Sequence, residues 1–226
     1  MIEDLLPPAA VALEAFDDPP GLRLYPEEAA CMARAMECRR REFATTRQLA
    51  RSGLTRLGLP PAGIPKGERG APRWPDGVVG SITHCAGYRA AAVARAADLL
   101  SIGIDAEPHG PLPPDILEFV ATPAERARLA GLAAANPKIA WDRLLFSAKE
   151  SVYKAWFPLA RSFLDFESAD VEFDEATATF VARLLVPGPA VAGKELRELT
   201  GRFAVRDGLA VTAVALGPCL LPDLLR

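Results

Sequence analysis

The segment 141–157 constrains the fold most strongly, because its apolar residues indicate a helix that must be covered on most of its sides. One broad buried stripe is predicted by apolar residues at three- and four-residue steps, namely Trp141, Leu144, Leu145, Ala148, Val152, Ala155 and Trp156. A second apolar set, Phe146, Tyr153 and Phe157, lies on another side of the same helix. Only a narrow polar window remains, which consists of Arg143, Ser147, Glu150 and Lys154. A polar window in a buried helix indicates a functional site.

Two charge patterns could serve that site. Glu150 and Lys154 are four residues apart and therefore share a helix face. The segment 101–107 is predicted to be a strand, so Asp105 and Glu107 point to the same face, roughly 7 Å apart at the backbone. Two carboxylates at that spacing can share a hard cation, most often Mg²⁺. Each pattern alone has an ordinary alternative, a turn cap for the strand and a solvated ion pair for the helix.

Together the two patterns resemble a known family. The sequence Ile102-Gly-Ile-Asp-Ala-Glu107 and the sequence Phe146-Ser-Ala-Lys-Glu-Ser-Val-Tyr-Lys154 match, without a gap, the two signature motifs of the 4′-phosphopantetheinyl transferases of the Sfp type. The segment Gly80-Ser-Ile-Thr-His-Cys85 resembles a third segment of that family. The likeness extends from about residue 39 to about residue 215 and is greatest to the bacterial branch that includes enterobactin-type and actinobacterial enzymes.

The resemblance implies a set of reacting residues. The metal site would be formed by the triplet Asp105, Ala106 and Glu107 together with Glu150, and Mg²⁺ or Mn²⁺ would suit its oxygen ligands. Glu150 is the first choice for the general base, and whether it is a base or only a metal ligand is left open. Lys154 would stabilise charge on the leaving phosphate, and Lys149 is a further catalytic candidate.

The resemblance also implies a binding region for coenzyme A as cosubstrate. Arginines concentrate between residues 34 and 56, where the ordinary interpretation is a solvated basic helix face. Arginine also suits phosphate, and coenzyme A carries several phosphate groups. The positions that match the family's cosubstrate-binding residues are Arg39, Arg47, Lys66, Gly67, Glu68, Arg69, Thr83, His84 and Lys154.

The predicted fold class is α+β. Family members have two similar α/β halves related by a pseudo-twofold axis, with the active site in the cleft between them, and the proline-rich stretch after Glu107 suggests halves at 1–107 and 108–226. Helices are expected at 27–57, with a break near Thr45 and Thr46, at about 115–135, and from Trp141. Strands are expected at 78–83, 90–94, 99–105, 169–173, 179–185, 201–206 and 209–215.

Composition excludes several classes. A hydrophobic fraction of 50% in 226 residues excludes disorder, and a net charge of −3 argues against general nucleic-acid binding. The acidic start and the interrupted apolar tract at 209–221 predict no signal peptide and no membrane span, so a cytoplasmic protein is expected. The resemblance implies a monomer, because the family's long form already contains both halves. The sparse cysteines, Cys31, Cys38, Cys85 and Cys219, are interpreted as reduced thiols.

The predicted function is transfer of the 4′-phosphopantetheine arm of coenzyme A to a serine of an acyl or peptidyl carrier protein domain, with release of 3′,5′-ADP. Such domains belong to fatty-acid, polyketide or nonribosomal-peptide synthases, including those of siderophore pathways. Two alternatives remain at this point. One is another Mg²⁺-dependent phosphoryl transferase or a coenzyme A hydrolase, and the other is a non-catalytic adaptor.

Overall fold

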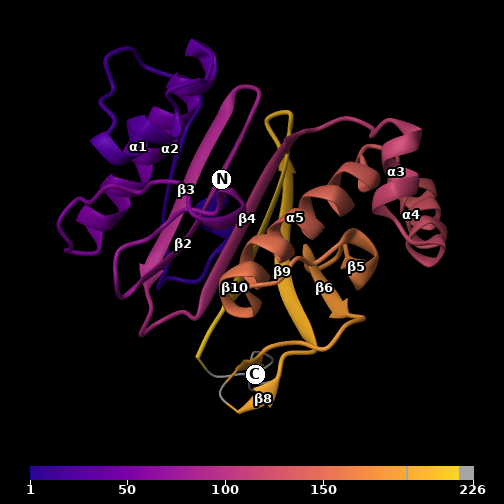
Figure 1. Cartoon of the computed structure of the whole chain (residues 1–226). Coiled ribbons are helices and arrows are strands. Elements are labelled where there is room, and N and C mark those ends of the chain that lie inside the picture. Colours follow the sequence, from indigo (N-terminus) through magenta and orange to yellow (C-terminus); the bar gives the residue numbers. More distant parts are fainter. Residues whose placement is uncertain (192, 219–226) are drawn as a thin grey trace.

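Two antiparallel sheets organise the chain, which is a mixed α/β protein (Figure 1). The computed structural model describes residues 1–191 and 193–218. The first sheet has the order β1-β3-β2, with β1 at Val11–Ala15, β2 at Val78–Cys85 and β3 at Tyr88–Arg95. The second has the order β4-β10-β9-β6-β5, and its strands are β4 (Ser101–Pro108), β5 (Ala169–Asp174), β6 (Thr179–Leu184), β9 (Glu198–Arg206) and β10 (Leu209–Leu216). A small separate pair is formed by β7 (Ala190–Val191) and β8 (Lys194–Glu195).

The long helix of the first half covers one face of the first sheet. The 3₁₀ helix η1 (Ile2–Leu5) precedes β1, and α1 (Pro26–Cys31) and α2 (Glu37–Arg56) follow it. The expected break near Thr45 and Thr46 is wrong, because both hydroxyls donate to carbonyls of their own helix, those of Arg41 and Phe43. The interruption lies instead at residues 32–36. A short 3₁₀ turn, η2 (Glu68–Gly70), lies in the loop that leads to β2.

Helix α5 (Trp141–Ala160) lies across the second sheet and buries the predicted stripe against it (Figure 1). The expected helix at 115–135 is two helices, α3 (Pro114–Val120) and α4 (Pro123–Ala135). They separate because Thr122 caps α4, accepting from the N–H of Glu125, and Pro123 occupies the first turn. The 3₁₀ turn η3 (Phe166–Ser168) then leads into β5.

Strands β2 and β4 lie side by side, although they belong to different sheets (Figure 1). Side chains join them: Ser81 Oγ accepts from the N–H of Ile104 at 3.1 Å, and Thr83 Oγ1 accepts from the N–H of Ala106 at 3.2 Å. We call this contact the seam. Because β4 pairs with β10, it belongs to the second sheet, and the predicted boundary at residue 107 separates it from its own sheet. The division into halves at residue 107 stays a prediction.

Two further sequence expectations can be compared with the described residues. No helix within residues 1–191 and 193–218 has the length and apolar character needed to cross a membrane. Cys31, Cys38 and Cys85 are free, as expected, and Cys219 lies outside the described residues.

Candidate active site

The acidic strand β4 lies along α5, and its alternating side chains explain the contact. Ile102, Ile104 and Ala106 are fully buried in the core formed with the first sheet. The intervening positions face α5, where Ser101 Oγ donates to the carbonyl of Ala155 at 2.7 Å. Gly103 sits so close that a Cβ there would lie 1.8 Å from the carbonyl oxygen of Ser151. The strand therefore presents Asp105 and Glu107 to the polar window of the helix.

Asp105 is the buried centre of this arrangement. Its Oδ1 accepts from Lys154 Nζ at 2.7 Å and from Thr83 Oγ1 at 3.3 Å. Lys154 also donates to the carbonyl of Ile104 at 3.1 Å. The other carboxylate oxygen, Oδ2, is buried and has no hydrogen-bond partner in the described part of the chain. A buried carboxylate oxygen without a donor is costly, which indicates that a ligand completes it.

Glu107 and Glu150 complete an acidic cluster with Asp105. Glu107 Oε2 accepts from Arg143 Nη1 at 3.2 Å. Burial raises the pKa of Glu107, the Asp105 charge raises it further, and Arg143 offsets part of the effect. Burial also raises the pKa of Glu150, where Lys154 lowers it and Asp105 raises it. Asp105 is therefore close enough to repel both Glu107 and Glu150, and added positive charge would favour the ionised form of all three.

The cluster fits a hard divalent cation in its chemistry, because its donors are carboxylate oxygens. Within residues 1–191 and 193–218, no three His, Cys, Asp or Glu side chains are gathered closely enough to form a ready metal cage. Two of the carboxylates are instead paired with cations of the protein, Asp105 with Lys154 and Glu107 with Arg143. The unpartnered Oδ2 of Asp105 and the repulsion among the carboxylates are the observations that support a cation here.

A second set of predicted residues gathers around a small cavity of ≈ 110 Å³, lined by Arg39, Arg47, Lys66 and His84. We call it the cationic pocket. Arg39 Nη1 donates to the His84 ring, 3.1 Å from its Nδ1. Burial and the Arg39 charge lower the pKa of His84 to about 4, so the ring is neutral at pH 7. A pocket with two arginines and a lysine is suited to an anionic ligand.

Arg47 is more constrained than a simple phosphate ligand. It is 4% exposed, its Nε donates to the carbonyl of Ile64 at 2.8 Å, and its guanidinium lies 3.8 Å from the centroid of the Phe43 ring. Desolvation lowers its pKa to about 10, which still leaves it charged at pH 7. Arg47 therefore holds the loop that precedes Lys66 as well as lining the pocket.

A larger cavity of ≈ 680 Å³ separates segment 69–82 of the first half from α5, and we call it the cleft. Glu150 and Lys154 line one side of it and Arg69 another. The cleft and the cationic pocket share Gly70, Pro72 and Ile82 as lining residues, so they adjoin. Glu150 and the cationic residues thus flank one continuous region.

Comparison with known proteins identifies the family. Residues 27–94 match the 4′-phosphopantetheinyl transferase N-terminal domain, and residues 101–206 match the 4′-phosphopantetheinyl transferase superfamily. The chain belongs to the 4′-phosphopantetheinyl transferases. Among its relatives, 4′-phosphopantetheinyl transferase Svp of Streptomyces mobaraensis is 59% identical over 95% of this chain and 89% of its own. 4′-Phosphopantetheinyl transferase PptT of Mycobacterium tuberculosis is 49% identical over 90% of both chains, and enterobactin synthase component D of Salmonella typhimurium is 34% identical over 66% of this chain and 60% of its own. The resemblance stated from the motifs is therefore confirmed, and the chain is an enzyme of this type.

In this transferase, two predicted site residues point away from the acidic cluster. Lys149 is 4% exposed and donates to Glu125 Oε2 at 2.8 Å and to the carbonyls of Val120 and Phe166. None of these three partners belongs to the acidic cluster, because consecutive residues of a helix point in directions about 100° apart. These contacts support a structural role for Lys149 in the fold, and its catalytic role stays a prediction. Ala106 is likewise buried in the core, and its N–H is bonded to Thr83.

The predicted loop residues lie at the surface between the two cavities. Lys66, Glu68 and Arg69 are exposed and Gly67 is half-buried. Lys66 Nζ lies 5.4 Å from the centroid of the Phe43 ring. Arg69 adopts a φ of 51° and lies 5.4 Å from the Phe163 ring centroid. Lys66 and Arg69 therefore reach the cationic pocket and the cleft, whereas nothing beyond position assigns a role to Glu68.

The sequence interpretation missed the side chains that hold this loop. Glu28 is fully buried, accepts from Arg51 Nη1 at 2.8 Å through both oxygens, and accepts from the N–H of Ile64 at 2.9 Å. Arg47 bonds the carbonyl of the same residue, so the Ile64 peptide is fixed from both sides. The only signal available was a glutamate among apolar residues in a short helix, and its partners lie 23 and 36 residues away.

Proposed function

We propose that this transferase moves the 4′-phosphopantetheine arm of coenzyme A to a serine hydroxyl of acyl or peptidyl carrier proteins. The observation that carries the proposal is the seam, where Thr83 bonds Asp105 while the next residue, His84, lines the cationic pocket. One strand thus joins the groups suited to phosphate charge with the acidic cluster. A ligand with several phosphates at one end and a reacting phosphate next to them matches this layout.

The chain's own groups account for the transfer step. Asp105, Glu107 and Glu150 would hold Mg²⁺, or Mn²⁺, which supplies charge neutralisation to the pyrophosphate. The serine oxygen attacks the pantetheine-side phosphorus, and the bond from that phosphorus to the bridging oxygen breaks, which releases 3′,5′-ADP. Glu150, whose raised pKa suits proton transfer, accepts the serine proton directly or through a water. Lys154 stabilises charge on the leaving phosphate.

In this proposal the cosubstrate lies across the cleft and the cationic pocket. Arg39, Lys66 and Arg69 contact its anionic groups, with His84 and Thr83 on the β2 side. Arg47 lines the cationic pocket and also supports the loop that leads to Lys66, because it donates to the carbonyl of Ile64. Gly67 keeps the loop compact, because a Cβ there would meet the Arg73 side chain at 2.7 Å.

The two halves are proposed to be related by a pseudo-twofold axis, with the active site between them. Strand order supports this relation, since in each sheet the first strand pairs with the last and the last with the one before it. In each half a long helix, α2 or α5, packs on the first and last strands of its own sheet. A cytoplasmic monomer that serves fatty-acid, polyketide, nonribosomal-peptide or siderophore assembly completes the proposal, and the likeness to enterobactin synthase component D supports the siderophore role.

The test is intact-mass spectrometry of apo acyl and peptidyl carrier proteins incubated with the enzyme, coenzyme A and Mg²⁺. We expect a gain of one phosphopantetheine on the carrier serine, lost when EDTA is added and regained with excess Mg²⁺ or Mn²⁺. Hydrolysis of coenzyme A without carrier modification would contradict the proposal. The variant Glu150→Gln separates the two roles of Glu150, because a base alone would leave metal affinity intact while turnover falls.

A further inference from the structure

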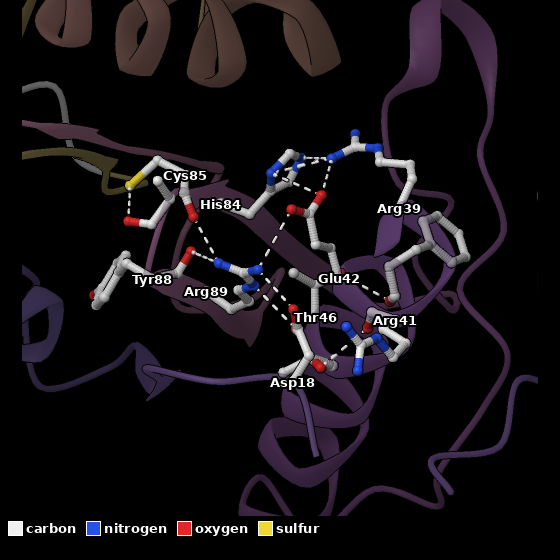
Figure 2. A network of polar contacts seen from close by, with 12 residues as sticks. Asp18, Arg39, Arg41, Glu42, Thr46, His84, Cys85, Tyr88 and Arg89 are labelled. Carbon is white, nitrogen blue, oxygen red and sulfur yellow. Dashed lines mark hydrogen bonds and ion pairs between the residues drawn. The ribbon is translucent and has the colours of Figure 1, made fainter. Parts of the chain in front are cut away.

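A chain of charged side chains leads from the protein surface to the cationic pocket (Figure 2). Arg89 is 6% exposed and forms a two-pronged pair with Asp18, at 3.0 and 2.6 Å. The same guanidinium reaches Glu42 Oε1 at 3.4 Å. The other oxygen of Glu42 accepts from Arg39 Nη1 at 2.9 Å, and Arg39 bonds the His84 ring. The sign of the charge alternates at every step from Asp18 to Arg39.

The chain connects separate elements around the pocket. Asp18 lies in the loop after β1, Glu42 and Arg39 lie on α2, and Arg89 lies on β3. Arg89 also donates to the carbonyl of Cys85 at 2.6 Å, which fixes the β2–β3 turn directly after His84. Arg89 thus supports the two pocket residues near Glu42 indirectly, Arg39 through Glu42 and His84 through the turn at Cys85.

Glu42 has two opposing effects on an anionic ligand. Its negative charge, next to Arg39, repels an anion, but Arg89 neutralises its second oxygen and ions in solution screen the remainder. It also holds Arg39, whose side chain is 40% exposed and would otherwise sample many rotamers. Fixing a long side chain in its binding geometry before the ligand arrives removes an entropy cost from association. We expect the ordering of Arg39 to outweigh the repulsion of the anion, because Arg89 offsets the charge of Glu42 whereas nothing offsets the gain from ordering.

We propose that Glu42, supported by Arg89 and Asp18, is a positioning residue that sets Arg39, and through Arg39 the His84 ring, for the anionic part of coenzyme A. The inference rests on the proposed function for the identity of the ligand. Asp18, Glu42 and Arg89 belong to none of the signature motifs. They are 24 to 71 residues apart in the sequence and are brought together only by the fold. Its effect is on affinity for the cosubstrate and not on the chemical step.

The first test measures the dissociation constant of coenzyme A by titration calorimetry, without carrier protein, for Glu42→Gln and Asp18→Asn. We expect Glu42→Gln to weaken binding about fivefold to tenfold, as for one freed side chain, and Asp18→Asn to weaken it by a smaller factor. The control is Glu37→Gln, which removes the same charge from an exposed position in the first turn of α2. Unchanged or tighter binding by both test variants would overturn the inference.

The second test asks whether Glu42 acts through Arg39. Because residues in one network are not additive, the double variant Glu42→Gln/Arg39→Ala should bind coenzyme A no more weakly than Arg39→Ala alone. In the carrier assay, Glu42→Gln should raise KM for coenzyme A and leave kcat and KM for the carrier within about twofold. Additive losses, or a fall confined to kcat, would refute it. If Glu42→Gln does not fold, the same binding measurements are made on Asp18→Asn. A wild-type enzyme that binds coenzyme A but does not modify carriers would refute the proposed function and leave the positioning role of Glu42 standing.

Discussion

Gly103 is predicted to be a position where the smallest substitution, to alanine, strongly destabilises the protein. A Cβ at this residue would lie 1.8 Å from the Ser151 carbonyl oxygen and 2.7 Å from the Ala155 nitrogen, both backbone atoms of α5. Real Cβ contacts essentially never fall below 3.0 Å, so α5 would have to recede from β4 by at least about 1.2 Å. Neither atom can turn aside, because each belongs to the helix backbone.

The cost follows from the packing that this shift undoes. Overpacking a core typically costs about 1–3 kcal/mol when side chains can adjust, and here a buried helix must move as a body. The movement also opens a gap along β4, where lost dispersion contacts add to the cost. We therefore expect Gly103→Ala to lower the free energy of unfolding by about 3–5 kcal/mol.

The assay is urea unfolding followed by circular dichroism, with Gly131→Ala as the matched control. Gly131 lies in α4, where an added Cβ would meet no neighbouring atom within 4 Å, so alanine there should stabilise the protein by about 0.5–1 kcal/mol. The two variants make the same chemical change and are expected to shift the midpoint in opposite directions. A Gly103→Ala protein within about 1 kcal/mol of wild type would refute the close backbone contact between β4 and α5 at this point.

Two further predictions concern charged residues near the site. Lys149→Met should lower the free energy of unfolding by about 3–5 kcal/mol, because it leaves Glu125 buried without its partner, whereas Lys154→Met should abolish transfer and change stability far less. Both variants are compared by urea unfolding and in the carrier assay. A stable but inactive Lys149→Met protein would support a catalytic role for Lys149. Because burial and Arg39 lower the pKa of His84 from 6.5 to about 4, the unfolded chain binds a proton that the folded one does not, so stability should fall as pH drops from 6.5 to 4. His84→Asn should make that decline smaller by about 1 kcal/mol, a value reduced because the His84 side chain is about one-third exposed. Equal declines for the two proteins would contradict the lowered pKa of His84.

The sequence predicted the elements that carry the site because periodicity is a local property. The strand at 101–107 and the helix from Trp141 are present at those positions, and the alternation along the strand puts Asp105 and Glu107 on the face that meets the helix. The interruption near Thr122 was missed, although its signals are equally local, since Thr122 and Pro123 are ordinary residues for the start of a helix. The misplaced break at Thr45 arose because a hydroxyl can cap a new helix or bond back to its own.

The connections between elements were not accessible in the same way. Nothing in the period of β4 indicates that it pairs with β10, more than one hundred residues on, and not with β3. Lys149 is buried against Glu125 and Lys154 pairs with Asp105, and this difference depends on what packs on each side of α5. Glu42 has no local feature that separates it from a solvated helix residue. These roles depend on contacts at long separation in sequence, which a single sequence does not specify.

The seam explains why the site needs both halves of the chain. Strand β4 contributes Asp105 but is an edge strand of its sheet, and its N–H groups at Ile104 and Ala106 would be buried without partners if Ser81 and Thr83 were not beside them. Thr83 satisfies one of these groups and also bonds the carboxylate itself. One of the two hydroxyls that close the interface, that of Thr83, therefore also orients the site. Folding of the interface and assembly of the active site are, for this reason, a single event.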